Sequence, residues 1–318
     1  MTYNFKFAHR KARLRGSLLA ALILNLASCN TADLLTSDSS VDPQGLGDGS
    51  TIAGETDLPS FATSFAGGIP FGTYALPTSW FGSYYNGALR NIAPDQLRSE
   101  LAAIKSRGGK VVLMFAGNER WYKDANHHFS FTKWKDRIDR FRRISFSSFI
   151  TDGTIIAHYL IDEPNDPHNW GGQAISGNTL EEMAKYSKQI WPGLATVVRT
   201  DATYLAKWSG YHYLDAAWAQ YVSRKGSPGD YIKANISAAQ NRGLALITGL
   251  NLIDGNAGSK MTASQVKSWG STLLSYSYPC AFVSWTYNST YLSSSGIKDA
   301  MRYLRYKAQS RSTKSCRS

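Results

Sequence analysis

Two adjacent carboxylates, Asp162 and Glu163, stand directly after an apolar run of the sequence. The run 154–161 has the length and composition of a buried strand, and Pro164 follows the two carboxylates. A carboxyl group beside a buried element can keep its proton near neutral pH, which suits it for general acid catalysis. The pair therefore predicts acid and base chemistry at a strand end. The alternative interpretation is an acidic pair that caps the following loop.

Aromatic and amide side chains follow the other apolar runs. Aromatic rings can stack on the faces of sugar rings, and amides can orient hydroxyl groups through hydrogen bonds. Their combination at several strand ends predicts a carbohydrate-binding cleft, although such aromatics can also cap a barrel core. Together with Asp162, the candidate substrate-binding residues are Tyr74, Trp80, Glu119, Trp121, Asn165, Trp218, Gln220, Asn251, Trp285 and Tyr287.

Seven short apolar runs, separated by amphipathic segments, must position these side chains. We expect strands at 71–75, 110–116, 154–161, 195–200, 213–219, 244–250 and 280–286. This alternation favours an α/β fold of the (β/α)8 TIM-barrel type, whose functional groups stand at the carboxyl ends of the strands. This count is one strand short of eight. Three explanations are open: the region 61–65 forms the eighth strand, one β/α unit is degenerate, or the barrel is incomplete. No glycine-rich phosphate loop follows the first strand, which argues against a dinucleotide-binding fold.

Several of the intervening helices have recognisable starts. Thr179 with Glu182 and Thr262 with Gln265 have capping-box spacing, and Pro228 stands at the first position of another helix. These starts support the alternation of strands and helices.

The segment 159–165, which contains Asp162, Glu163 and Pro164, resembles the strand-end motif of clan A glycoside hydrolases and related barrel families. In these families an Asn-Glu-Pro or Asp-Glu-Pro sequence presents the general acid/base glutamate. The resemblance implies that Glu163 donates a proton to the glycosidic oxygen and that Asp162 orients the substrate or tunes Glu163. It covers 71–308 as a barrel pattern and only this motif in detail.

The sequence departs from these families in its second carboxylate. Clan A enzymes place a second glutamate, the nucleophile, at the end of a late strand, but no glutamate follows Glu182 in this chain. As partners for Glu163 we rank Asp254 first, Asp201 second and Glu119 third. A separation of about 5–5.5 Å between the two carboxyl groups would fit a retaining nucleophile, and one of about 6.5–9.5 Å would fit inversion through water.

The missing glutamate supports a second hypothesis, in which the barrel belongs to a non-catalytic carbohydrate-binding or envelope-interaction protein. Metal catalysis is disfavoured, because the histidines match no zinc-hydrolase spacing and a lone strand histidine such as His158 usually belongs to the core. We expect no metal, no other cofactor and a monomer.

The N-terminus has the features of a lipoprotein signal peptide. A basic stretch through Arg15 precedes an apolar run at 18–26, which is too short to span a membrane. Cys29 ends a Leu-Ala-Ser-Cys sequence that resembles the bacterial lipobox. The resemblance implies an acylated Cys29, an extracytoplasmic location and a membrane anchor, with an ordinary cleaved signal peptide as the alternative. In a Gram-negative host, Asn30 favours the outer membrane or cell surface.

The chain divides into four parts. We expect a signal peptide at 1–28, a flexible acidic tether at 29–58, the barrel domain at 59–309 and a basic tail at 310–318. The net charge of +12 is segmental, with +5 at 1–28, −6 at 29–58, +7 at 59–301 and +6 at 302–318. Nucleic acid is not an expected partner of an anchored extracytoplasmic protein, and the sequence contains no recognition motif for it. The basic residues from Lys133 to Arg143 form a solvated helix face, or else contact anionic lipid or acidic polysaccharide.

The three cysteines do not predict a disulfide framework. We expect Cys280 to be a small buried apolar residue at a strand start, and Cys316 to be free or incidental in the tail.

Overall fold

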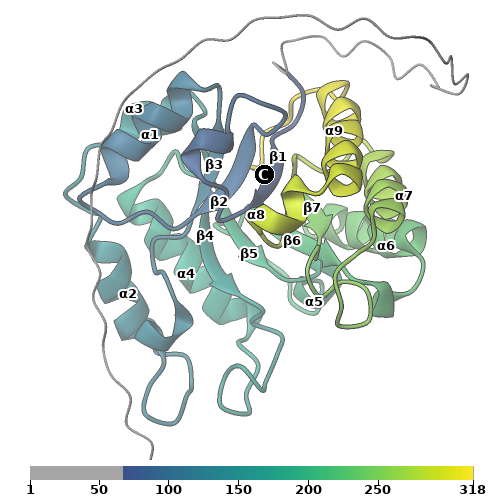
Figure 1. The fold of residues 1–318 in the computed structure, drawn as a ribbon. Coiled ribbons are helices and arrows are strands. Elements are labelled where there is room, and N and C mark those ends of the chain that lie inside the picture. The colour runs from purple at the N-terminus through teal and green to yellow at the C-terminus, as the bar shows by residue number, and fades with distance from the viewer. Residues whose placement is uncertain (1–66, 318) are drawn as a thin grey trace, which may run out of the picture. The chain divides into compact units, whose positions relative to one another are not determined.

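Eight parallel strands close into a barrel in the order in which they occur along the chain (Figure 1). The computed structural model describes residues 67–317, so the expected signal peptide, the tether, Cys29 and the region 61–65 lie outside the described residues. The strands are β1 (Phe71–Tyr74), β2 (Gly87–Arg90), β3 (Lys110–Leu113), β4 (Ile155–Asp162), β5 (Thr196–Arg199), β6 (Ala216–Tyr221), β7 (Ala245–Leu250) and β8 (Ala281–Ser284). Strand β1 pairs with both β2 and β8, which closes the sheet. The predicted (β/α)8 TIM-barrel fold is confirmed.

Helices connect the strands and surround the barrel (Figure 1). The α-helices are α1 (Leu97–Ser106), α2 (Phe131–Asp139), α3 (Ser147–Thr151), α4 (Gly177–Ile190), α5 (Ala202–Leu205), α6 (Pro228–Gln240), α7 (Ala263–Leu274), α8 (Ser289–Ser293) and α9 (Ser295–Gln309). The 3-10 helices are η1 (Thr78–Trp80), η2 (Glu119–Tyr122) and η3 (Ser223–Lys225).

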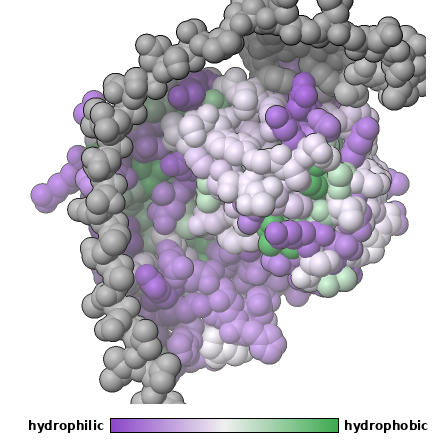
Figure 2. Space-filling view, in the orientation of Figure 1, coloured by the Kyte–Doolittle hydropathy of each residue, from purple (hydrophilic) through white to green (hydrophobic). Residues whose placement is uncertain are grey.

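The described face in Figure 2 combines hydrophilic residues with a broad area of intermediate hydropathy, and its hydrophobic residues cover limited areas. Between residues 67 and 317, no helix has the length and apolar composition needed to cross a membrane.

Strand β2 is the strand that the sequence interpretation missed. Strands β1, β3, β5 and β8 also have four residues, but β2 contains a glycine, an arginine and only two larger apolar residues, Ala88 and Leu89, so no apolar run identifies it. The 3-10 helix η1 lies between β1 and β2 in place of an α-helix. Of the three explanations for the missing strand, the structure therefore supports a degenerate β/α unit. The two strands approach closely, because a Cβ at Gly72 would lie 1.8 Å from the carbonyl oxygen of Gly87.

Two layers of apolar side chains stabilise the barrel. The inner layer fills the barrel and includes Tyr159 and Trp218. The outer layer lies between the strands and the helices. His158 is buried against Phe115 of the outer layer, with its Nδ1 2.7 Å from Ser187 Oγ. Burial lowers the pKa of His158 to about 3, so this histidine is a neutral core residue, as its position in a strand predicted.

The expected helix starts are confirmed at two places and wrong at a third. Thr262 and Gln265 form a capping box at α7, and Pro228 stands in the first turn of α6. Helix α4 begins earlier than Thr179 predicted, because the Ser176 side chain accepts a hydrogen bond from the Thr179 amide and caps the helix.

Cys280 and Cys316 form a disulfide bond, so the interpretation of these cysteines as separate residues is wrong. Cys280 directly precedes β8, at the end of the barrel opposite the carboxyl ends of the strands, and Cys316 is buried in the segment after α9. The bond ties the basic tail to the barrel across a sequence separation of 36 residues. Sequence reasoning missed it because the residues around Cys316 are polar and the pairing depends on how the chain returns after α9.

Replacing Cys280 and Cys316 together by alanine is expected to lower the free energy of unfolding by about 3 to 4 kcal/mol, because a closed loop of this length restricts the unfolded chain. Denaturant unfolding of the full chain would measure the loss, and reduction of the unaltered protein should produce a similar one. Ser312→Ala, at an exposed position of the same tail, is the control. Equal unfolding midpoints for all the proteins would contradict a stabilising role of the bond.

Candidate functional site

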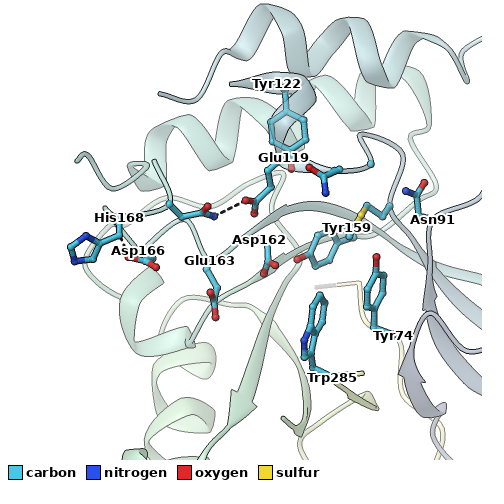
Figure 3. A pocket seen from close by; sticks show the side chains of 14 residues that line it. Tyr74, Asn91, Glu119, Tyr122, Tyr159, Asp162, Glu163, Asp166, His168 and Trp285 are labelled. Atoms are coloured by element: carbon cyan, nitrogen blue, oxygen red, sulfur yellow. Dashed lines mark hydrogen bonds between the residues drawn. The ribbon is translucent and has the colours of Figure 1, made fainter. Parts of the chain in front are cut away.

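A cavity of about 610 Å³, here called the main cavity, opens at the carboxyl ends of the strands (Figure 3). This is the end at which a TIM barrel carries its functional groups. Four carboxylates line the cavity, and they belong to Glu119, Asp162, Glu163 and Asp166. The Asp162–Glu163 pair therefore lies where the strand assignment predicted.

Arg199, the last residue of β5, holds the two adjacent carboxylates. Its Nε donates a hydrogen bond to Asp162 Oδ1, and its Nη2 lies 3.3 Å from Glu163 Oε1. Its Nη1 donates a hydrogen bond of 2.7 Å to Gln220 Oε1 on β6. Only 7% of Arg199 is exposed. Burial by itself lowers the pKa of this guanidinium, but the charge of Asp162, with smaller effects of Tyr159 and Glu163, outweighs burial and raises the pKa above its usual value.

Glu163 stands at the rim of the main cavity in an unusual backbone conformation. Its φ is +36°, in the left-handed region that residues other than glycine rarely adopt. Its amide donates a hydrogen bond of 2.9 Å to the Arg199 carbonyl, which helps to hold this conformation. Its side chain is 48% exposed. Backbone strain of this kind is concentrated at functional sites, so the conformation of Glu163 adds to the argument from its position.

Glu119, in η2 after β3, is a more buried carboxylate of the same cavity. Its Oε2 accepts a hydrogen bond of 2.7 Å from Asn169 Nδ2 (Figure 3) and lies 3.5 Å from Lys123 Nζ. Burial raises the pKa of Glu119 and the charge of Asp162 adds to the increase, whereas Asn169 and Lys123 reduce it in part. Glu119 is therefore protonated more readily than an ordinary glutamate.

Aromatic rings form another part of the cavity wall. Tyr74 and Trp285 stack with 4.5 Å between their ring centroids and 7° between their planes. The Arg199 guanidinium lies over the Trp285 ring, 4.8 Å from its centroid. Figure 3 shows the Tyr159 hydroxyl directed towards Asp162. Burial, with the charge of Asp162, raises the pKa of Tyr159 well above its usual value. The main cavity thus combines carboxylates in different surroundings with aromatic surface.

A smaller cavity of about 130 Å³ adjoins the main cavity at Glu163, which lines both. Besides Glu163, five of the residues predicted from the sequence line this second cavity, and they are Asn165, Asp201, Trp218, Gln220 and Asn251. They come from the ends of β5, β6 and β7 and from the loop after β4. The structure therefore distributes the predicted residues between two neighbouring cavities.

The ranking of the second carboxylate does not agree with the structure. Asp254, ranked first, is exposed and lines neither cavity, and its amide donates a hydrogen bond to Asn251 Oδ1 in the turn after β7. Asp201, ranked second, lines the smaller cavity and accepts a hydrogen bond of 2.8 Å from Lys225 Nζ. Glu119, ranked third, is the one of the three that lines the main cavity with Glu163.

Four predicted aromatic residues, Trp80, Trp121, Trp218 and Tyr287, lie outside the main cavity. Trp80 and Tyr287 contact each other edge-on. Trp121 is half exposed, with the Arg120 guanidinium over its ring. Trp218 is fully buried inside the barrel and offers no exposed face to a sugar. Of the predicted aromatic residues, Tyr74 and Trp285 are the two that line the main cavity.

Arg199, Tyr159 and Asn169 belong to the site but were not among the predicted site residues. Arg199 is a charged residue at the end of an apolar strand, and that signal could have identified it. Tyr159 stands within the apolar run of β4 and Asn169 in the loop after it, so their spacing alone distinguishes neither.

The sequence matches no protein-family model and no curated protein. Solved structures share the fold. Clostridial cellulose synthase subunit Z from Clostridioides difficile has a TM-score of 0.52 at 10% identity, over 74% of this chain and 99% of that chain. Exo-β-1,4-mannosidase Op5Man5 from Opitutaceae bacterium strain TAV5 has a TM-score of 0.51 at 11% identity, over 76% of this chain and 60% of that chain. A structure described as an endoglucanase has a TM-score of 0.50 at 8% identity, over 74% of this chain and 97% of that chain. At such identities the likeness establishes the barrel fold.

The pKa of Glu119 is expected to respond in opposite directions to two substitutions. Asn169→Ala removes a hydrogen bond to the charged form and should raise this pKa, whereas Asp162→Asn removes a neighbouring negative charge and should lower it. Carbon NMR titration of the Glu119 carboxyl would measure both shifts, with Asp95→Asn at an exposed position of the surface as the control. Shifts of the same sign would show that the assigned causes are wrong.

Proposed function

We propose that this protein binds a polysaccharide or glycoconjugate in the main cavity and hydrolyses a glycosidic bond there. The observation that carries the proposal is the presence in one cavity of a readily protonated carboxyl group and of a carboxylate paired with a buried cation. Burial raises the pKa of Glu119, and Asp162 is the ion-pair partner of Arg199. Glycoside hydrolysis uses a proton donor and an ionised carboxylate in this way. Tyr74 and Trp285 supply aromatic surface for a sugar ring.

The proposed reaction gives each of three carboxyl groups one task. Glu119 donates its proton to the glycosidic oxygen as the bond from that oxygen to the anomeric carbon breaks. Positive charge develops on the sugar, and the Asp162 carboxylate stabilises it. Water attacks the anomeric carbon, and Glu163 at the exposed rim accepts the proton that the water loses. Exchange with solvent then returns a proton to Glu119 and removes one from Glu163.

This assignment differs from the one that the strand-end motif implies, in which Glu163 is the proton donor. Glu163 is half exposed and faces the Arg199 cation, whereas Glu119 is more buried and has a raised pKa. These surroundings support Glu119 as the donor. The neighbouring folds support the class of substrate, since their names include a cellulose synthase subunit, an exo-mannosidase and an endoglucanase.

A second candidate function is carbohydrate binding without catalysis. The observation that favours it is the composition of the late strand ends, where Asn251 follows β7 and Trp285 follows β8. A barrel with an amide in place of a late carboxylate can retain a glycan without cleaving it.

We also propose that the protein is an extracytoplasmic lipoprotein anchored through Cys29, on the basis of its lipobox-like sequence. The disulfide between Cys280 and Cys316 supports this location, because structural disulfides form and persist mainly in oxidising compartments. The two observations are independent, since they come from opposite ends of the chain.

Glu119→Gln is expected to lower the rate of glycan hydrolysis by about 10²- to 10⁴-fold, because the donor can no longer supply a proton. The decline of activity at high pH, where Glu119 loses its proton in the unaltered protein, should disappear with it. Glu163→Gln should reduce the rate, because the group that accepts the proton of the attacking water is lost. Product release from a panel of neutral and acidic glycans would measure both profiles.

Asp254→Asn is the control for these variants, because Asp254 lines neither cavity. If Glu163→Gln lost the decline of activity at high pH while Glu119→Gln kept it, Glu163 would be the proton donor and the proposed assignment would be wrong. Glycans that bind but are never cleaved would support the second candidate function.

Cys29→Ala is expected to move the protein from the membrane fraction to the soluble fraction and to abolish its labelling by radioactive palmitate, because the acylated residue is lost. Ser39→Ala, in the expected tether, is the control. Release of the unaltered protein into the medium without label would instead indicate an ordinary signal peptide.

A further inference from the structure

The smaller cavity is placed to hold the next part of a bound glycan. It adjoins the main cavity at Glu163, the residue that faces the bond in the proposed reaction. Its walls come from the ends of β5, β6 and β7 and from η3. A chain that crosses Glu163 would therefore place one of its groups in this cavity.

Each of the three amide side chains that line this cavity accepts one hydrogen bond at its oxygen, and its nitrogen makes none among residues 67–317. Thr200 Oγ1 donates to Asn165 Oδ1 at 2.7 Å, and the backbone amide of Asp254 donates to Asn251 Oδ1 at 3.0 Å. Gln220 Oε1 accepts a hydrogen bond of 2.7 Å from Arg199. Each oxygen keeps one further lone pair, but none of the three amide nitrogens donates a hydrogen bond among residues 67–317, so the unused groups are mainly donors.

The evidence for an unused donor is strongest for Gln220. It is only 6% exposed, and its Nε2 is buried without a hydrogen-bond partner among residues 67–317. The bond from Arg199 fixes the amide oxygen, so Nε2 is the group of this lining residue that still lacks a partner. A buried donor without an acceptor is unfavourable, and an acceptor on a ligand would remove that cost.

The charges around the cavity leave one cation without compensation. Asp201 accepts hydrogen bonds from Lys225 Nζ at 2.8 Å and from the Tyr231 hydroxyl at 2.6 Å, and Glu163 faces Arg199. Arg224 is exposed at the cavity, and within the described part of the chain it makes neither an ion pair nor a hydrogen bond. The cavity therefore offers donors and an unpaired positive charge.

We propose that the smaller cavity binds an oxyanion, a carboxylate or a sulfate, carried by the sugar next to the bond that Glu163 faces. The proposal rests on the proposed glycan hydrolysis and names its substrate class, an acidic glycan. An oxyanion supplies only acceptors, which matches the free donors of Gln220, Asn251 and Asn165 and the charge of Arg224. A neutral hydroxyl group could accept from the same amides but would leave the charge of Arg224 without a counter-charge.

Titration calorimetry of the full chain with methyl β-D-glucuronide, methyl β-D-glucoside and sodium sulfate would test the proposal. We expect the glucuronide to bind at least tenfold more tightly than the glucoside, because charged hydrogen bonds contribute on this scale. Arg224→Gln and the isosteric Gln220→Glu should each weaken the glucuronide about tenfold and leave the glucoside unchanged. Arg98→Gln, which removes the same charge from an exposed position of α1, should change neither.

Sulfate that competes with the glucuronide but binds more weakly would support an oxyanion subsite that also contacts the sugar. Equal affinity for the two glycosides, no binding by any probe, or unchanged glucuronide binding in both variants would overturn the proposal. The test needs no turnover. Selective glucuronide binding by a protein that cleaves no glycan would therefore refute the proposed hydrolysis alone, and cleavage of neutral glycans without this selectivity would refute the oxyanion subsite alone.

Discussion

The ion pair between Asp162 and Arg199 is the interaction on which the candidate site depends. The register of β4 and β5 places the two residues side by side at the strand ends. A buried guanidinium is costly unless its donors are paired, and Asp162, Glu163 and Gln220 provide the acceptors. The Asp162 charge in turn adds to the effect of burial in raising the pKa of Glu119. Loss of Arg199 would leave Asp162 without its ion-pair partner, and loss of Asp162 would remove a charge that acts on Glu119.

The two ends of the barrel are stabilised in different ways. At the carboxyl ends of the strands, charged side chains are paired around an open cavity, and Glu163 has a strained backbone. At the other end, the bond between Cys280 and Cys316 holds the tail against the barrel, and these cysteines belong to the inner apolar layer. Stability concentrated at one end permits polar and strained groups at the other, which is the usual division in a TIM barrel.

The fold was predictable because its signals are local, whereas much of the site was not. Seven strands are apolar runs, but β2 has four residues that no periodicity identifies. Asp162 and Glu163 were found because they follow β4 directly. Their partner Arg199 lies on the next strand, and its pairing depends on register. Asp254 was misplaced because loop paths decide exposure, and the partner of Cys280 was missed because it lies in a polar tail.

One arginine also connects the two cavities. Nε and Nη2 of Arg199 serve the carboxylates Asp162 and Glu163, while Nη1 fixes the amide of Gln220 on the next strand. The planar guanidinium cannot move one of these nitrogens without moving the others. The orientation of the Gln220 donor in the smaller cavity and the position of the Asp162 charge in the main cavity are therefore set by the same rigid group. A substitution that removes the Arg199 guanidinium must therefore act on both cavities, because it releases the carboxylates and the amide together.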